Sequence, residues 1–238
     1  MTASTEPPPP GRWERLLGGV PGARSFRSWT IDANDGIIAT SGILEGFAGA
    51  GATHSVLVTA ASAATVAGAL GLGGSTWAEE AAEREAQLEL VADERADLAA
   101  DPAAEVGELA ALYERKGLTE SLAREVAEQL TAHDALAAQL EAEHGIAEVM
   151  SRAAPVWAGV SAAVAFALGA AVPLLITISV SAAVESWAIF VAAVVSLTLT
   201  SLVASRAGDL SVSRTLARTL TVGVGTLAVS YLAGRVLF

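Results

Sequence analysis

Two pairs of carboxylates lie three residues apart in the most acidic part of the chain: Glu94 with Asp97, and Glu105 with Glu108. On an α-helix, residues three apart project from one face, so each pair would hold two like charges together, and these repel. If the two helices fold back on each other, the pairs converge, and a divalent cation with several oxygen ligands would neutralise them. The pattern therefore predicts a metal site. The alternative is that these acids only form the solvated face of an acidic helical unit.

Two further acids, Asp35 and Glu45, lie inside an apolar segment over residues 29–52 that is long enough to cross a bilayer. Asp35 is six residues after Trp29, roughly 9 Å along a helix, and an ionised carboxylate at such a depth is costly unless a cation, a proton or a partner subunit compensates it. Asp35 and Glu45 are therefore candidates for a path by which cations cross. The alternatives are that Asp35 caps a kink with its neighbours, and that Glu45 pairs with a polar group elsewhere in the bundle.

The composition around these acids is that of a membrane protein. The chain has 238 residues, of which 53% are hydrophobic and 17% charged, and its mean hydropathy is +0.49. A bilayer core of about 30 Å needs roughly 20 apolar helical residues. Five segments meet this length: residues 29–52, 55–77, 154–178, 185–204 and 216–237. The sequence thus predicts an all-α membrane protein with five transmembrane helices, two in residues 26–78 and three in residues 153–238.

The orientation follows from the basic residues that flank the spans. Arg12, Arg15, Arg24 and Arg27 precede the first span, which places the N-terminus in the cytoplasm by the positive-inside rule. Residues 1–25 form a polar, proline-rich segment that is predicted to be a flexible tail. Residues 79–152, between spans two and three, then lie in the cytoplasm. The short loops and the Ala-rich, cysteine-free composition favour a multi-pass protein of a bacterial plasma membrane.

The cytoplasmic insert at residues 79–152 is strongly acidic and is predicted to be a three-helix, metal-binding domain. It carries 19 Asp and Glu against 6 Lys and Arg. Its first helix continues from span two through residues 79–99. Asp101 followed by Pro102 is a helix start signal for the second helix. Gly117 suits the end of that helix, and a third helix runs from Thr119 to about Glu143.

The residue inventory excludes several kinds of chemistry. The chain has no cysteine, and its only methionines are Met1 and Met150, so any metal must be held by oxygen or imidazole. His144 adjoins Glu143 and could add an imidazole ligand, although a solvated surface histidine has the same pattern. No nucleophile and base set and no basic nucleic-acid patch is evident, so we expect neither an enzyme nor a nucleic-acid partner.

Small residues recur every four positions in the first predicted span, at Gly42, Gly46 and Ala50. Such a ridge lets two helix backbones approach closely in a membrane. It could join two copies of the chain, or it could serve a contact within one chain.

The chain resembles the vacuolar iron transporter family from about Phe26 to its C-terminus. The resemblance rests on several segments together: Asn34-Asp35-Gly36 with the small-residue run to Ala50, Ala67-Gly68-Ala69-Leu70, the segments at residues 108–113 and 124–130, Glu143-His144-Gly145-Ile146, and the stretch from Gly169 to Pro173. It implies a homodimer that moves ferrous iron, and often manganese, out of the cytosol in exchange for protons. It also implies that clustered cytoplasmic acids collect the metal, here Glu94, Asp97, Glu105, Glu108 and Glu143, and that Asp35 lies on the ion path.

Several residues depart from the family pattern. Ser28, Leu72 and Thr76 replace an Asp, a Met and a Glu that many members have, and Gln139 and Leu140 stand where some members have Met. Asp97 replaces a more usual Glu, and the position of Glu45 is often uncharged. Without soft thioether ligands, discrimination in favour of softer ions weakens. Transport of a divalent cation is therefore a firmer expectation than transport of iron specifically.

Two classes of function follow from these patterns. The first is a divalent-cation and proton antiporter for Fe²⁺, with Mn²⁺ as a further substrate; the acidic helices bind Fe²⁺, Mn²⁺ or Zn²⁺, and no other cofactor is expected. The second is a non-transporting membrane anchor whose acidic helices bind metal or dock a basic partner protein. Metal uptake into proteoliposomes would discriminate between them.

Overall fold

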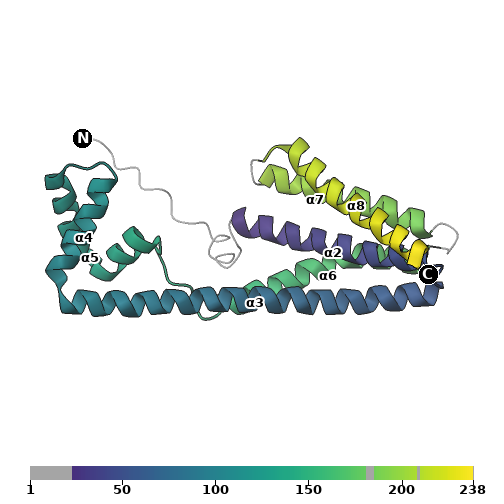
Figure 1. The fold of residues 1–238 in the computed structure, drawn as a ribbon, viewed down its shortest axis with the longest axis horizontal. Coiled ribbons are helices and arrows are strands. Elements are labelled where there is room, and N and C mark those ends of the chain that lie inside the picture. Colours follow the sequence, from purple (N-terminus) through teal and green to yellow (C-terminus); the bar gives the residue numbers. More distant parts are fainter. Residues whose placement is uncertain (1–22, 181–184, 208–209, 238) are drawn as a thin grey trace, which may run out of the picture. The chain divides into compact units, whose positions relative to one another are not determined.

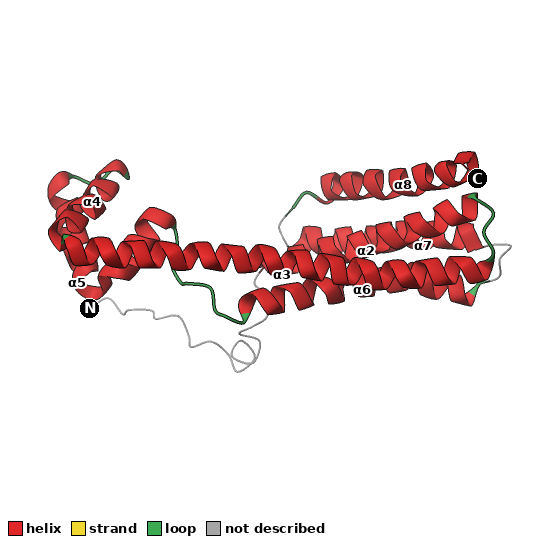
Figure 2. Ribbon diagram, turned by 60° about the horizontal axis from the view of Figure 1, so that its bottom comes forward, coloured by secondary structure: helices red, strands yellow, loops and turns green. Residues whose placement is uncertain are grey.

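The computed structural model describes residues 23–180, 185–207 and 210–237, and every regular element in these ranges is a helix (Figure 1). The helices are α2 (Ala23–Gly49), α3 (His54–Ala100), α4 (Pro102–Arg115), α5 (Glu120–His144), α6 (Ala154–Ser179), α7 (Glu185–Ala207) and α8 (Val212–Leu237). Figure 2 shows the same all-helical content in a second view. Residues 1–22 of the predicted flexible tail, with Arg12 and Arg15, lie outside the described residues.

The chain divides into two compact units. Met1–Gly74 and Val160–Phe238 form the first, called here the membrane unit, and Ser75–Gly159 form the second, called here the acidic unit. The helix α3 contributes its first part to the membrane unit and its remainder to the acidic unit. The predicted insert over residues 79–152 falls within the acidic unit.

Four helices of the described chain are long and apolar enough to span a membrane: α3, α6, α7 and α8. The first predicted span corresponds to α2, which has 27 residues and is therefore about 40 Å long. It is long enough to span, but Asp32, Asp35 and Glu45 lower its apolar content. The structure thus supports a multi-pass membrane protein, and the count of five spans stays a prediction.

Within the membrane unit, α2 lies between α8 on one side and α3 with α6 on the other, as Figures 1 and 2 both show. Close backbone contacts explain several of its small residues. A Cβ on Gly36 would overlap the carbonyl oxygen of Phe166 in α6, and one on Gly169 of α6 would overlap that of Ala33. Leu44 of α2 is fully buried in a cluster that includes residues of α3 and α7. Apolar burial around α2 therefore holds the unit together.

The small-residue ridge of α2 contacts α8 of the same chain. A Cβ on Gly42 would lie 3.3 Å from Ser230 Oγ, and one on Gly46 would lie 3.4 Å from the Ser230 carbonyl oxygen. Gly234 of α8 approaches the Gly46 carbonyl oxygen so closely that it has no room for a Cβ. Of the two roles that the sequence allowed, the structure thus shows the contact within one chain, and the predicted homodimer cannot be derived from this ridge.

The helix boundaries in the acidic unit follow the sequence signals closely. Asp101 Oδ1 accepts hydrogen bonds from the backbone N–H groups of Ala103 and Ala104, at 3.1 and 3.0 Å, and so caps α4. Gly117 and Gly145 adopt positive φ angles of 103° and 68° just after the ends of α4 and α5. The helices α4 and α5 pack through Leu109, Ala110 and Ala127.

The predicted third helix of the insert is not continuous. Asp134 inside α5 has φ −157° and ψ 98°, which breaks the helical conformation. Its Oδ1 accepts a hydrogen bond of 3.0 Å from the Ala137 N–H, so the side chain caps the second half of α5. Two hydrogen bonds to α3 anchor the chain after α5. The Met150 backbone oxygen accepts from Arg84 Nε at 3.1 Å, and the Met150 N–H donates to Gln87 Oε1 at 2.9 Å. The Met150 contacts thus join the segment after α5 to α3.

Candidate metal site and the acids of the membrane unit

The acidic unit brings five carboxylates together from three helices. Glu94 of α3 interacts electrostatically with Glu105 of α4, Glu143 of α5 and its own helix neighbour Asp97. Glu105 in turn interacts with Glu108, Asp97 and Glu143. The turn at Asp101 and Pro102 reverses the chain between the two i, i+3 pairs, and Gly145 ends α5 directly after its acidic last turn. The five acids that the sequence singled out are therefore neighbours in the fold.

Glu94 lies at the buried centre of this cluster. Only 6% of its surface is exposed, and its Oε1 has no hydrogen-bond partner among the residues that the structure describes. Burial, and then the charges of Glu105, Glu143 and Asp97, raise the pKa of Glu94 to about 7. A side-chain hydrogen bond with Glu105 favours the protonated form of Glu94 further. A solvated face would not bury an acid in this way, so the environment of Glu94 differs from that of an acid on an exposed surface.

Glu105 is oriented by Gln139. The Gln139 side chain is buried, and its Nε2 donates to both the backbone oxygen and the Oε2 of Glu105 at 2.8 Å. Burial raises the pKa of Glu105, with further contributions from the charges of Glu108, Asp97 and Glu143. Gln139 stands where some relatives are expected to have Met. In this chain the position supplies a hydrogen-bond donor that fixes a carboxylate, in place of a thioether.

Three groups in the cluster are close enough to hold one metal ion. One ligand atom each from Glu94, Glu143 and His144 lies within 4.8 Å of the others. An ion with bonds of about 2.1 Å spans roughly 4 Å between opposite ligands, so small side-chain movements would let it contact all three. Carboxylate oxygen with one imidazole suits Mn²⁺, Fe²⁺ and Zn²⁺. His144, which the sequence left between a ligand and a surface residue, lies at the cluster.

The three residues of the Asn34-Asp35-Gly36 segment have different surroundings. It is regular helix in α2, so the proposed kink at Asp35 is not observed. Asn34 Oδ1 accepts a hydrogen bond from Thr200 Oγ1 of α7, and Gly36 packs on α6. The Asp35 side chain is exposed on the single chain. If α2 spans the membrane as predicted, a carboxylate exposed on it needs a partner outside the single chain, which a cation, a proton or a second copy would supply.

Glu45 has the opposite environment. Only 4% of its surface is exposed, and its Oε2 accepts a hydrogen bond of 2.6 Å from Ser186 Oγ of α7, which is the polar partner that the sequence left open. Its Oε1 has no hydrogen-bond partner in the described part of the chain.

Asp32, which the sequence analysis missed, is half-buried and precedes Asp35 by three residues. The i, i+3 spacing that identified the acidic pairs would also have found it.

The fold and the acids together define an all-helical, multi-pass membrane protein that carries a compact acidic helical unit. The model of the VIT family matches residues 26–235, and the chain belongs to this family, which confirms the predicted resemblance. The chain is also 32% identical over 151 residues to a protein named vacuolar iron transporter from Acanthamoeba castellanii. That alignment covers 63% of this chain and 54% of the relative, so the match spans about half the length of the curated relative.

Proposed function

We propose that this protein transports a divalent metal cation out of the cytosol in exchange for protons, and that the acidic unit collects the ion. The observation that carries the proposal is the convergence of Glu94, Glu105 and Glu143 from three helices, with the Glu94 Oε1 buried and unpartnered within the described chain. A site of this kind gains most from a cation, because the cation removes the repulsion between the ionised carboxylates and satisfies the buried oxygen that has no partner. Membership of the VIT family and the acids of α2 support transport rather than binding alone.

The proposed substrate is Fe²⁺, with Mn²⁺ as a second substrate. The name of the Acanthamoeba relative supports iron. The donors at the site are carboxylates and one imidazole, and the described chain brings no sulfur ligand to them, so they provide little discrimination between Fe²⁺ and Mn²⁺.

The proposed path passes Asp35. Its exposure on a single chain, in a helix that packs within the membrane unit, supports a homodimer in which the two copies of α2 enclose an ion path. In this arrangement the cation compensates Asp35 during passage, and the second copy shields the acid from lipid.

The test is uptake of Fe²⁺ or Mn²⁺ by proteoliposomes that contain the full-length protein. We expect uptake above that of empty liposomes for the wild-type protein and none for Asp35→Asn, which keeps the side-chain shape and removes the charge. Glu85→Gln is a matched control, because Glu85 is exposed on α3 and is not one of the five clustered acids. Wild-type protein that carries no metal under any gradient would overturn the proposal.

A further inference from the structure

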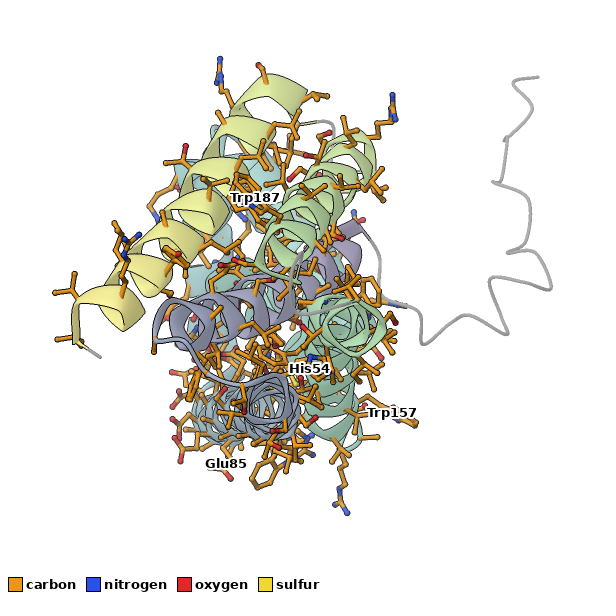
Figure 3. All side chains as sticks on the ribbon, turned by 90° about the vertical axis from the view of Figure 1, so that its right-hand side faces the viewer. His54, Glu85, Trp157 and Trp187 are labelled. Carbon is orange, nitrogen blue, oxygen red and sulfur yellow. The ribbon has the colours of Figure 1, made fainter. Side chains whose placement is uncertain are left out.

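A cavity of about 550 Å³ lies in the membrane unit between α2, α3, α7 and α8. It is at the end of the unit where α2 ends and α3 begins, and Figure 3 views this end, with His54 of α3 and Trp187 of α7 labelled. Both of these residues line the cavity and are exposed, so the cavity reaches the surface. Under the predicted orientation this is the non-cytoplasmic face.

Glu45 lies in the wall of this cavity with half of its carboxyl group unsatisfied. Ser186 Oγ donates to Oε2 at 2.6 Å, whereas Oε1 is buried and has no hydrogen-bond partner among the described residues. A buried polar atom without a partner is costly, and an unpaired charge more so. The position therefore favours an occupant that satisfies Oε1 and removes the charge.

The lining indicates which occupant this is. Apart from Glu45 and Ser186, the side chains of the cavity that carry a polar group are those of His54, Tyr231 and Trp187, and the remaining wall is apolar, with residues such as Leu57 and Phe190. A divalent cation that leaves water requires several ligands close together, and the one side chain of the described residues that a hydrogen bond places beside the Glu45 carboxyl is Ser186. A proton needs one carboxylate oxygen and leaves a neutral group that the apolar wall tolerates.

We propose that Glu45 is the proton-carrying residue of the transport cycle, loaded through this cavity from the face at which α2 ends, and separate from the acids that pass the metal. The inference rests on the proposed function, because it assigns the proton side of that exchange. The titratable groups that share the cavity are His54 from α3 and Tyr231 from α8; no other titratable residue of the described chain lines it. His54 lies at the mouth and can relay protons between water and Glu45.

Two measurements on full-length protein in proteoliposomes test the assignment. The first is net Mn²⁺ uptake driven by an imposed pH gradient, and the second is exchange of labelled external Mn²⁺ for unlabelled internal Mn²⁺ at equal pH. Glu45→Gln still accepts the Ser186 hydrogen bond but cannot release a proton. We expect it to lose the gradient-driven uptake and to retain the exchange, because exchange requires no proton to return. Glu45→Asp, which keeps a titratable carboxyl, should recover part of the uptake, and Glu85→Gln should change neither.

Two results would overturn the assignment, and a third would overturn the proposed function. Gradient-driven uptake at the wild-type level in Glu45→Gln would show that the proton binds elsewhere. Loss of both activities in a variant that remains monodisperse and keeps its metal binding would make Glu45 a metal-passing acid. Wild-type protein without exchange would instead overturn the proposed function. Infrared difference spectra separate these failures when they are measured in a Glu94→Gln background, which removes the titrating carboxyl of the acidic unit. In that background a protonated carboxyl band that titrates should be absent once Glu45→Gln is added and present once Asp35→Asn is added, whether or not metal moves.

Discussion

A side-chain hydrogen bond between Glu94 of α3 and Glu105 of α4 raises the pKa of Glu94 and acts to lower that of Glu105. Such a hydrogen bond requires that one of the two carboxyl groups be protonated, and the pKa of about 7 makes Glu94 the group that binds this proton below that pH in the metal-free cluster. A divalent cation that binds there must displace this proton before both groups can act as ligands. Proton release and metal capture are therefore coupled at the proposed collection site, before the ion enters the membrane unit.

The stability of the metal-free acidic unit should fall as pH rises. The pKa of Glu94 is about 7 in the folded state against an ordinary value of 4.5, so between these values the folded state binds more protons than the unfolded state. The stabilisation is fully present below about pH 4.5 and is lost as pH rises through 7, with a loss of up to about 3 kcal/mol. Hydrogen-exchange protection factors of α4 and α5, measured with a chelator present, should decrease over this range. Glu94→Gln should remove most of the dependence; protection that rises with pH in the wild type would contradict it.

Metal binding should depend on the buried acids and should release protons. Calorimetry of the full-length protein with Mn²⁺ should show tighter binding at pH 8 than at pH 6, since ionised Glu94 is the ligand form. Glu105→Gln combined with Glu108→Gln should remove most of the binding heat. The control Glu85→Gln removes one charge, against two in the double variant, from an exposed position of the same unit and should leave affinity unchanged. An equal loss of Mn²⁺ affinity in this control would show that the cluster acts only through nonspecific negative charge.

His144 should contribute to metal affinity in a way that His133 does not. Both histidines are exposed on α5, but only His144 places a ring nitrogen within 4.8 Å of carboxylate oxygens of Glu94 and Glu143. His144→Ala should weaken Mn²⁺ or Zn²⁺ binding by about tenfold or more, the scale seen when even an outer partner of a metal ligand is removed. His133→Ala is the matched control. Equal metal affinities for the two variants would show that His144 is a surface residue and not a metal ligand.

The contact between α2 and α8 should be intolerant of a single methyl group. Gly234→Ala would place a Cβ against the Gly46 carbonyl oxygen, whereas Gly225→Ala on the same helix would meet nothing within 4 Å. The first change should lower stability by about 1–3 kcal/mol or more, as overpacking does, and the second should be close to neutral. Thermal unfolding in detergent measures both. If the two variants unfold at the same temperature, α8 does not pack on the ridge as described.

Most predictions about the acidic unit rested on residues that act locally, within a turn of their own positions. Asp101, Pro102 and Gly117 act within a turn of their own positions, so their effect on helix boundaries can be read without knowing the fold. The convergence of the two acidic pairs followed from one tight turn between them. The break at Asp134 was not predicted. The residues around it favour a continuous helix, and the Asp134 side chain instead accepts a hydrogen bond from the backbone three residues on, which competes with that helix.

The membrane unit was harder to predict because its contacts join distant segments. The Glu45 to Ser186 hydrogen bond spans 141 positions, and the Asn34 to Thr200 hydrogen bond spans 166. Nothing in the local pattern around Glu45 indicates a serine partner on α7 or a cavity beside it. The ridge at Gly42 and Gly46 shows the same limit, since spacing reveals that a helix approaches closely and not which helix it is.

The last prediction separates collection of the metal from its passage. Asp35→Asn should abolish flux and leave binding by the acidic unit intact, because Asp35 lies on α2 of the membrane unit and the collecting carboxylates lie on α3, α4 and α5. The double variant Glu105→Gln with Glu108→Gln should slow transport mainly at low metal concentration. Its lost carboxylates serve to raise the local concentration of the ion, and a high bulk concentration replaces that effect.

The measurement is metal flux into liposomes as a function of metal concentration, with an imposed pH gradient, for both variants and for Glu85→Gln. The double variant should approach wild-type flux at saturating metal, whereas Asp35→Asn should stay inactive at every concentration, because the barrier that the bilayer presents to a divalent ion does not depend on supply. Wild-type flux through Asp35→Asn would rule out the proposed path. Flux that does not change with the pH gradient in any variant would rule out proton exchange. It would leave the proposed path unaffected, because the carboxylate on α2 would still compensate the charge of the ion as it crosses.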